Sequence, residues 1–132
     1  MRKFFLILIW LYIFLTATPL LAFGDYKNGI SAFEKGDYDI PLREFKFLVE
    51  QKDYRGAYGL GLMYDLGLGV ATNFEEAVKW YQLLANKGNA DALNNLATMY
   101  AEGEGVERNA SKAAKLYESA AQNGNFDALN NL

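Results

Sequence analysis

The side chains that most often carry catalysis near neutral pH are missing from this sequence, whose 132 residues include no histidine and no cysteine. Histidine is the side chain whose ordinary pKa lies closest to 7, and cysteine supplies thiolate nucleophiles and zinc ligands. Three serines remain as possible nucleophiles, Ser31, Ser111 and Ser119, but no histidine is present to activate them. We therefore interpret the serines as solvated helix residues.

Carboxylates are the other candidates for chemistry, and they form two small groups. Glu102, Glu104 and Glu107 could supply oxygen ligands to calcium, but their spacing matches no calcium-binding loop. Glu75 and Glu76 could act as acid and base in glycoside hydrolysis, but neighbours on a helix point about 100° apart. We therefore interpret both groups as solvated surface. We expect a protein that is not an enzyme and that binds no cofactor and no metal.

The strongest positive signal is an internal repeat. The hexapeptide Asp-Ala-Leu-Asn-Asn-Leu at residues 91–96 recurs letter for letter at residues 127–132, which is a period of 36 residues. A period between about 20 and 50 residues is typical of a solenoid, in which each unit buries its apolar face by stacking on its neighbours. Function is therefore expected on a surface rather than in a closed pocket.

Each repeat reads as two helices joined by a glycine-containing loop. In the clearer copy this loop is Gly67-Leu68-Gly69-Val70. Asn73 is expected to cap the second helix, with Glu76 completing a capping box, so that the helix begins at Phe74. The apolar residues of this helix fall three and four positions apart, which predicts one buried stripe. The stripe consists of Ala77, Trp80, Tyr81, Leu84 and Ala85.

The ends of the remaining helices follow the same plan. Gly88 and Gly124 are expected to stop the second helices, and Asp91 and Asn109 are expected to cap the helices of the following repeat. Upstream, residues 27–35 and 39–52 form a more degenerate helical pair joined by a turn at residues 36–38.

The first 22 residues have the three-part pattern of a secretory signal peptide. Arg2 and Lys3 precede an apolar run over residues 4–15, and a small residue, Ala22, offers a cleavage site. We expect cleavage after Ala22 and a periplasmic or secreted protein, with no integral membrane segment afterwards. The alternative is an uncleaved anchor, because the uncharged span reaches the roughly 20 residues that a membrane helix needs.

Charge excludes a further class of partner. Cleavage would remove two of the 13 basic residues and leave 16 acidic ones, so that the mature chain carries a net charge of about −5. Binding to nucleic acid through phosphate contacts needs a basic face, and the composition offers none. We expect no nucleic-acid partner.

One long motif carries a family resemblance. It runs Leu60-x-x-Met63-Tyr64-x-x-Gly67-x-Gly69-Val70 and continues with Ala77-x-Lys79-Trp80-Tyr81 and Ala85-x-x-Gly88. It resembles the Sel-one-like repeat family, a relative of the tetratricopeptide repeats. The resemblance implies an all-α, right-handed solenoid of antiparallel helix pairs that serves as a scaffold for a protein or peptide partner. In exported bacterial members it also implies roles in envelope regulation or host contact.

The resemblance divides the chain and leaves two alternative functions open. After the signal segment we expect a divergent pair at residues 23–55, repeats at 56–91 and 92–127, and the start of a truncated third repeat at 128–132. One alternative is an envelope hydrolase or a protein that binds peptidoglycan or a β-lactam, because some family members are linked to that chemistry. The other is a structural spacer, part of a longer repeat array.

Aromatic residues predict where a partner binds. Tyrosines that recur in phase serve each repeat alike and are expected in the core. These are Tyr64, Tyr81, Tyr100 and Tyr117. Tyr58 does not recur, since its equivalents are Asn94 and Asn130 on the outward side of the first helices. We therefore predict that Tyr58, Asn94 and Thr98 line a concave partner-binding surface.

Overall fold

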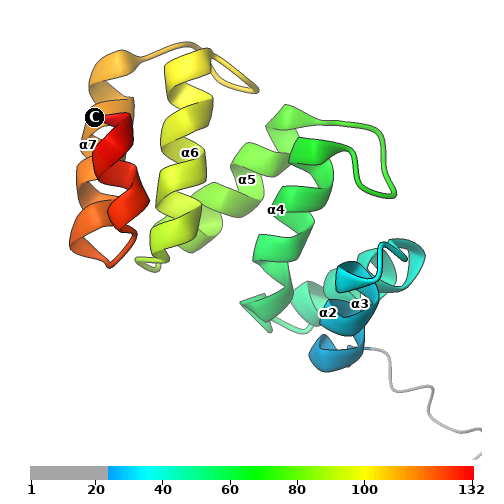
Figure 1. Ribbon diagram of the computed structural model, residues 1–132. Coiled ribbons are helices and arrows are strands. Elements are labelled where there is room, and N and C mark those ends of the chain that lie inside the picture. The colour runs from blue at the N-terminus through cyan, green and yellow to red at the C-terminus, as the bar shows by residue number, and fades with distance from the viewer. Residues whose placement is uncertain (1–23) are drawn as a thin grey trace, which may run out of the picture.

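The computed structural model describes residues 24–132, and every regular element in that range is a helix (Figure 1). The predicted signal segment, residues 1–22, lies outside the described residues. The elements are α2 (Tyr26–Glu34), α3 (Asp39–Glu50), η1 (Tyr54–Gly56), α4 (Ala57–Leu66), α5 (Phe74–Ala85), α6 (Ala90–Glu102), α7 (Ala110–Gln122) and η2 (Phe126–Asn131).

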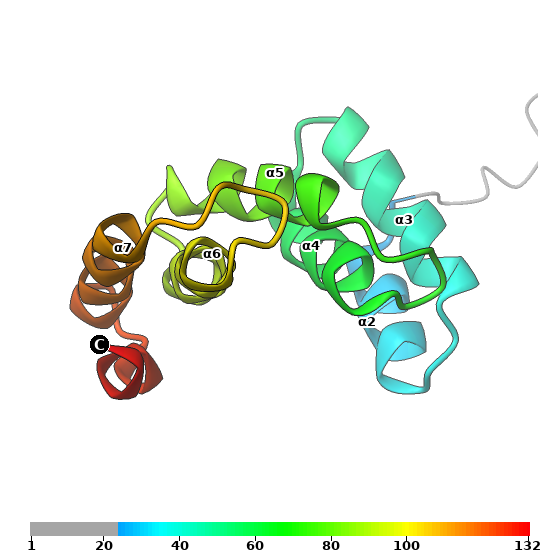
Figure 2. The ribbon, with the colours of Figure 1, turned by 90° about the horizontal axis from the view of Figure 1, so that it is seen from above.

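Helices adjacent in the chain pack as pairs, α2 with α3, α4 with α5 and α6 with α7. Seen from above, the first helix of each pair and η2 lie along the inner side of an arc, and α3, α5 and α7 lie along the outer side (Figure 2). The predicted right-handed α-solenoid of antiparallel pairs is therefore confirmed.

One buried aromatic residue per unit lies at equivalent positions of the core. Phe45, Tyr81 and Tyr117 stand 36 residues apart on α3, α5 and α7, and they are 0%, 0% and 6% exposed. Each ring lies against a small residue of its own first helix. A Cβ added to Gly29 would lie 2.6 Å from Cε1 of Phe45, and one added to Gly61 would lie 2.5 Å from Cε1 of Tyr81. Any larger side chain at these two positions would displace the ring.

The same rings also contact the next unit. A Cβ on Gly59 of α4 would lie 2.4 Å from Cε2 of Phe45, so this ring is enclosed by α2 on one side and α4 on the other. Tyr81 shares a buried cluster with Ala92 and Leu96 of α6. Each aromatic residue therefore packs within its own unit and against the following one.

The second helix of the N-terminal pair, α3, is in phase with the repeats, whereas α2 ends only 32 residues before the end of α4. Beside the Phe45 match, Lys52 has φ 62° at the position that Gly88 (79°) and Gly124 (105°) occupy one and two periods later. At the end of α5 the bonds from Gly88 N to Ala85 O (2.9 Å) and from Asn89 N to Leu84 O (3.1 Å) form the expected glycine stop.

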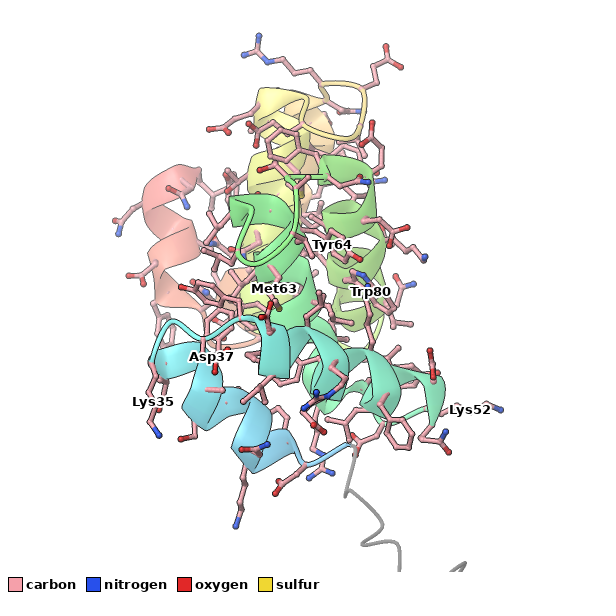
Figure 3. All side chains as sticks on the ribbon, turned by 90° about the vertical axis from the view of Figure 1, so that its right-hand side faces the viewer. Lys35, Asp37, Lys52, Met63, Tyr64 and Trp80 are labelled. Carbon is pink, nitrogen blue, oxygen red and sulfur yellow. The ribbon has the colours of Figure 1, made fainter. Side chains whose placement is uncertain are left out.

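The predicted stripe on α5 is partly confirmed. Ala77, Tyr81 and Leu84 are buried, whereas Trp80 and Ala85 are half-buried. Trp80 packs against the cluster around Phe45, and Figure 3 shows it above α3, on the same side as Met63 and Tyr64. Of the four tyrosines expected in the core, Tyr81 and Tyr117 are buried; Tyr64 and Tyr100 are half-buried.

The capping predictions need one refinement at α5. The helix begins at Phe74, and Oδ1 of Asn73 accepts a hydrogen bond from Glu76 N at 3.0 Å, as predicted. The predicted capping box is wrong, because Glu76 does not bond the N–H of Asn73. This N–H donates to the carbonyl of Tyr64 (2.8 Å), and the Glu76 carboxylate pairs with Lys79 (3.3 Å). The backbone bond to Tyr64 ties the glycine loop to the helix before it.

Asp91 is not the cap of α6, which corrects the expectation. The helix begins at Ala90, and the capping oxygen is Oδ1 of Asn89, 2.8 Å from Ala92 N. Oδ1 of Asp91 instead accepts a hydrogen bond from Nδ2 of Asn125 in the next unit (2.8 Å). The predicted cap of α7, Asn109, is confirmed by its bond to Lys112 N (2.9 Å).

The glycine loop of each unit rests on the start of the preceding second helix. Gly105 has φ 66°, and a Cβ there would lie 2.4 Å from the carbonyl carbon of Phe74. One unit earlier, a Cβ on Gly69 would lie 2.5 Å from Cβ of Tyr38. These close approaches fix the spacing between neighbouring units.

Gly105→Ala is expected to destabilise the chain by about 3 kcal/mol, because left-handed strain of about 1 kcal/mol adds to a clash with backbone that cannot rotate away. Gly36→Ala is the matched control, since Gly36 has φ 75° but nothing within 4 Å of an added Cβ. It should cost about 1 kcal/mol. Urea denaturation measures the free energy of unfolding of both variants. Equal losses would show that the loop does not set the packing of the units.

Candidate functional site

The three residues predicted to bind a partner all lie on first helices and are half-buried. The ring of Tyr58 packs against Tyr81, with 6.0 Å between centroids. Oγ1 of Thr98 donates to the carbonyl of Asn94 (3.2 Å) and lies 2.9 Å from the hydroxyl of Tyr117. The side chains of Tyr58 and Thr98 are thus held by core tyrosines, and only their outer parts are available to a partner.

A repeated hydrogen bond joins these residues along the first helices. Nδ2 of Asn95 donates to the hydroxyl of Tyr58 (3.3 Å), and Nδ2 of Asn131 donates to Oδ1 of Asn94 (3.2 Å). The two bonds connect equivalent positions, 36 residues apart. Asn95 therefore belongs to the candidate site, although it was not predicted. The recurrence of the Asn-Asn dipeptide at residues 94–95 and 130–131 could have indicated it.

A carboxylate, that of Asp65, lies at the end of α4, the helix that carries Tyr58. Oδ2 of Asp65 accepts a hydrogen bond from the hydroxyl of Tyr81 at 3.1 Å. Burial raises the pKa of Asp65 above 3.8, the bond from Tyr81 opposes the rise, and the charge of Glu102 adds to it. Burial is also the main reason that the pKa of Tyr58 is raised, with the charges of Asp91 and Asp65 contributing.

From α4 onward, charge is distributed unevenly between the first and second helices, whereas α2 carries both Lys27 and Glu34. The helices α4, α6 and η2 carry four acidic residues and no basic ones. The acidic residues are Asp65, Asp91, Glu102 and Asp127. The second helices α5 and α7 carry both signs, and their basic residues are Lys79, Lys112 and Lys115. We call the exposed surface of α4, α6 and η2, with Tyr58, Asn94, Asn95 and Thr98, the first-helix face.

The acidic residues of the first-helix face do not form a metal site. Within residues 24–132, no three Asp or Glu side chains are close enough together to hold a metal ion. Burial, followed by the charges of Glu102 and Asp65, raises the pKa of Glu104 in the loop after α6. Asp65, Glu102 and Glu104 are thus near enough to repel one another, but no three of the described carboxylates are close enough to chelate, an arrangement that suits contact with an extended cationic segment.

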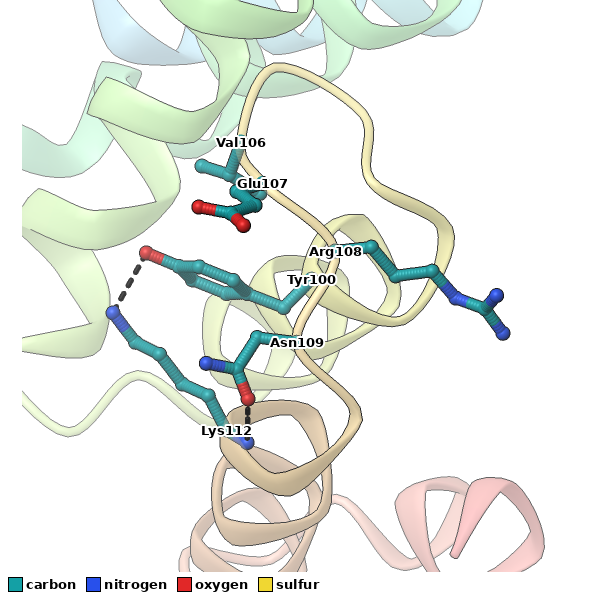
Figure 4. A pocket seen from close by; sticks show the side chains of 6 residues that line it. All are labelled: Tyr100, Val106, Glu107, Arg108, Asn109 and Lys112. Carbon is teal, nitrogen blue, oxygen red and sulfur yellow. Dashed lines mark hydrogen bonds between the residues drawn. The ribbon is translucent and has the colours of Figure 1, made fainter.

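A hollow of about 410 Å³ lies where the second glycine loop meets α7 (Figure 4). Nζ of Lys112 donates to the hydroxyl of Tyr100 at 2.7 Å and lies 4.1 Å from the centre of its ring. Figure 4 shows Arg108 turned away from the other lining side chains; its Nε donates to the carbonyl of Ala101 at 2.9 Å. The lysine is thus engaged in packing, and the hollow presents no nucleophile with its base.

Comparison with known proteins identifies the repeat. The family model for the Sel1 repeat matches residues 55–89 and 90–125. The crystal structure of a Sel1 repeat protein from Oxalobacter formigenes is 33% identical, with a TM-score of 0.67 over 76% of this chain and 41% of that chain.

Two further solved structures are similar. A protective antigen of uropathogenic Escherichia coli strains, which displays an SLR fold, is 30% identical with a TM-score of 0.67, over 77% of this chain and 23% of that one. Cysteine rich protein B of Helicobacter pylori shares the fold at 23% identity and a TM-score of 0.61, over 80% of this chain and 90% of that one. The chain spans less than half the length of the first two proteins.

Asp65→Asn is expected to stabilise the chain at pH 7 by up to about 1 kcal/mol, a gain kept small by the partial exposure of the group. The raised pKa means that the folded chain binds the Asp65 proton more tightly than the unfolded chain does. The stability contributed by Asp65 is therefore full below pH 3.8 and is lost as the pH rises through the raised pKa. Asparagine cannot ionise and can still accept the bond from Tyr81.

Urea denaturation of the native chain and the variant at pH 7 and near pH 3.5 checks this expectation. The difference should be present at the higher pH and disappear at the lower one. A difference of the same size at both would contradict the electrostatic explanation.

Proposed function

The chain belongs to the Sel1 repeat family, and we propose that it is an exported scaffold that binds a protein or peptide partner on its first-helix face. Sel1 repeat proteins are generally protein-interaction scaffolds without enzymatic activity. The observation that carries the proposal for this chain is the segregation of charge, with four carboxylates and no cation on α4, α6 and η2.

Hydrogen bonds between neighbouring units restrict the side chains of this face before a partner binds. The bonds from Asn95 to Tyr58 and from Asn131 to Asn94 hold side chains of neighbouring units in fixed positions. A partner then meets groups whose conformational freedom is already restricted, so less entropy is lost on binding. Tyr58 adds a half-exposed aromatic surface of the kind enriched at interfaces.

Charge complementarity favours a partner segment rich in lysine or arginine. The carboxylates are distributed over α4, α6 and η2 rather than gathered around one point, so an extended segment would contact them one after another. Opposite charges raise the association rate and reject acidic competitors. Neither the hydrolase nor the spacer alternative is favoured by a specific contact among residues 24–132.

We also propose that the chain acts in the periplasm or outside the cell after cleavage behind Ala22. The basic and apolar order of residues 1–22 supports export. Sel1 repeat proteins of bacteria are often periplasmic or secreted. Within residues 24–132, no helix has the length and apolar character that crossing a membrane requires.

Removing two charges from the first-helix face should weaken binding of a cationic peptide. The variant is Asp91→Asn with Glu102→Gln, and the probe is a fluorescent peptide of four Arg-Gly repeats. We expect about a fivefold to tenfold loss of affinity at low ionic strength, and a smaller loss at 0.5 M salt because the charges are screened. Fluorescence anisotropy measures the affinity.

The matched control is Glu75→Gln with Glu118→Gln, which removes two exposed carboxylates from the second helices α5 and α7. Net charge changes equally in the two double variants, so binding governed by net charge alone would weaken equally. Equal losses, or no binding by the native chain, would refute the assignment of the first-helix face.

A further inference from the structure

The first-helix face carries four asparagines as two consecutive pairs, one pair on α6 and one on η2. They are Asn94 and Asn95, and Asn130 and Asn131, 36 residues later. A side-chain amide has two N–H donors and a carbonyl acceptor, so it offers the same hydrogen-bonding groups as the peptide group of a main chain. Asparagine at equivalent positions of neighbouring units therefore presents a row of such groups to a partner.

Bonds between the units use only part of each amide. Nδ2 of Asn95 donates to the hydroxyl of Tyr58, and Oδ1 of Asn94 accepts from Nδ2 of Asn131. In the described part of the chain, no hydrogen bond uses Oδ1 of Asn95 or Nδ2 of Asn94. Both atoms reach solvent, because the one buried side-chain nitrogen or oxygen without a partner among the described residues is Nε1 of Trp80. An acceptor and a donor on α6 are thus available to a partner.

Similar groups recur on the neighbouring first helices. Asn130 stands one period after Asn94 and is exposed, and its side chain makes no hydrogen bond within residues 24–132. Tyr58 stands one period before Asn94, and its hydroxyl, which accepts the bond from Asn95, keeps a hydrogen to donate. Because α4, α6 and η2 line the inner side of the arc, a segment that runs along this side meets hydrogen-bonding groups on each element in turn (Figure 2).

Main chain that lacks regular secondary structure is the partner that can use these groups. Helices and sheets pair their own N–H and C=O groups, so a folded surface offers few of them. An extended segment leaves its main-chain groups bonded only to water. The four carboxylates on α4, α6 and η2 attract a cationic segment whatever its conformation. The amides therefore add a selection for conformation that charge alone does not provide.

We propose that the first-helix face binds the main chain of an extended, cationic segment of the partner. Oδ1 of Asn95 and Oδ1 of Asn130 accept main-chain N–H groups of this segment. Nδ2 of Asn94 and the hydroxyl of Tyr58 donate to its main-chain carbonyls. The inference rests on the proposed function and narrows it, because the partner becomes an unstructured segment rather than a folded surface. Binding is then tolerant of the neutral residues that lie between the cationic ones.

The test compares two isomeric peptides on the native chain by fluorescence anisotropy. Both derive from the peptide of four Arg-Gly repeats. Alanine replaces each glycine in one peptide, which keeps every N–H. Sarcosine replaces each glycine in the other, which moves the methyl group to the nitrogen and removes those N–H groups. Charge, length and atomic composition are identical. The sarcosine peptide should bind about tenfold more weakly, as expected for the loss of one or two hydrogen bonds, and equal affinities would overturn the proposal.

A second comparison separates the contacts from any effect of sarcosine on the peptide itself. In Asn95→Ala with Asn130→Ala the proposed acceptors are removed and the carboxylates remain, so the tenfold difference between the peptides should fall to about twofold or less. A difference that persists at tenfold would show that sarcosine alters the peptide rather than its contacts, which contradicts the proposal. If the double variant does not fold, Asn130→Ala alone, at an exposed position, should reduce the difference to about threefold.

The matched control is Asn86→Ala with Asn123→Ala. It removes two exposed asparagines from the C-terminal ends of the second helices α5 and α7. The number of amides removed is the same as in the first double variant, but neither lies on the first-helix face. The tenfold difference between the two peptides should therefore be retained.

The same peptides distinguish this inference from the proposed function. Asp91→Asn with Glu102→Gln should weaken both peptides alike, so that the ratio of their affinities stays near tenfold. If the two peptides bind the native chain equally and both lose affinity in this variant, a cationic partner is supported and recognition of its main chain is refuted. If neither peptide binds the native chain, both proposals are refuted.

Discussion

The structure depends on one aromatic ring per unit lying between the small residues of two successive first helices. Phe45 is enclosed by Gly29 and Gly59, and Tyr81 lies on Gly61 and shares its cluster with Ala92. Because each ring belongs to two units at once, burying it stabilises both the hairpin and the stack. A solenoid unit cannot bury its apolar face alone, and these rings provide the contact that couples one unit to the next.

The same contact positions the first-helix face, where we propose that a partner binds. The hydroxyl of Tyr81 reaches Asp65, and the hydroxyl of Tyr117 reaches Thr98, so the core extends by single hydrogen bonds to the first helices. The bond from Asn95 to Tyr58 then links neighbouring units along the exposed side. The first-helix face is therefore held in place by hydrogen bonds to a core that repeats beneath it.

Local sequence predicted much of this arrangement, and the errors at Asp91 and Asn95 have a common cause. The cap at Asn73 and the buried Tyr81 were predictable, because capping and helical periodicity depend on neighbours within a few residues. Asp91 was assigned wrongly because its oxygen bonds to Asn125 in the next unit. Asn95 was missed because its partner is 37 residues away. Contacts between units follow from register in space, which one repeat viewed alone does not specify.

The most direct test of the central claim is urea denaturation of Tyr81→Ala beside Tyr100→Ala. Tyr81 is fully buried between two units, and Tyr100 is a half-buried tyrosine of the same array. If the enclosed ring couples the units, Tyr81→Ala should cost about 4 kcal/mol and Tyr100→Ala about half as much or less. If Tyr81→Ala costs no more than Tyr100→Ala, the enclosed rings do not hold the array together, and the coupling between units must come from other contacts.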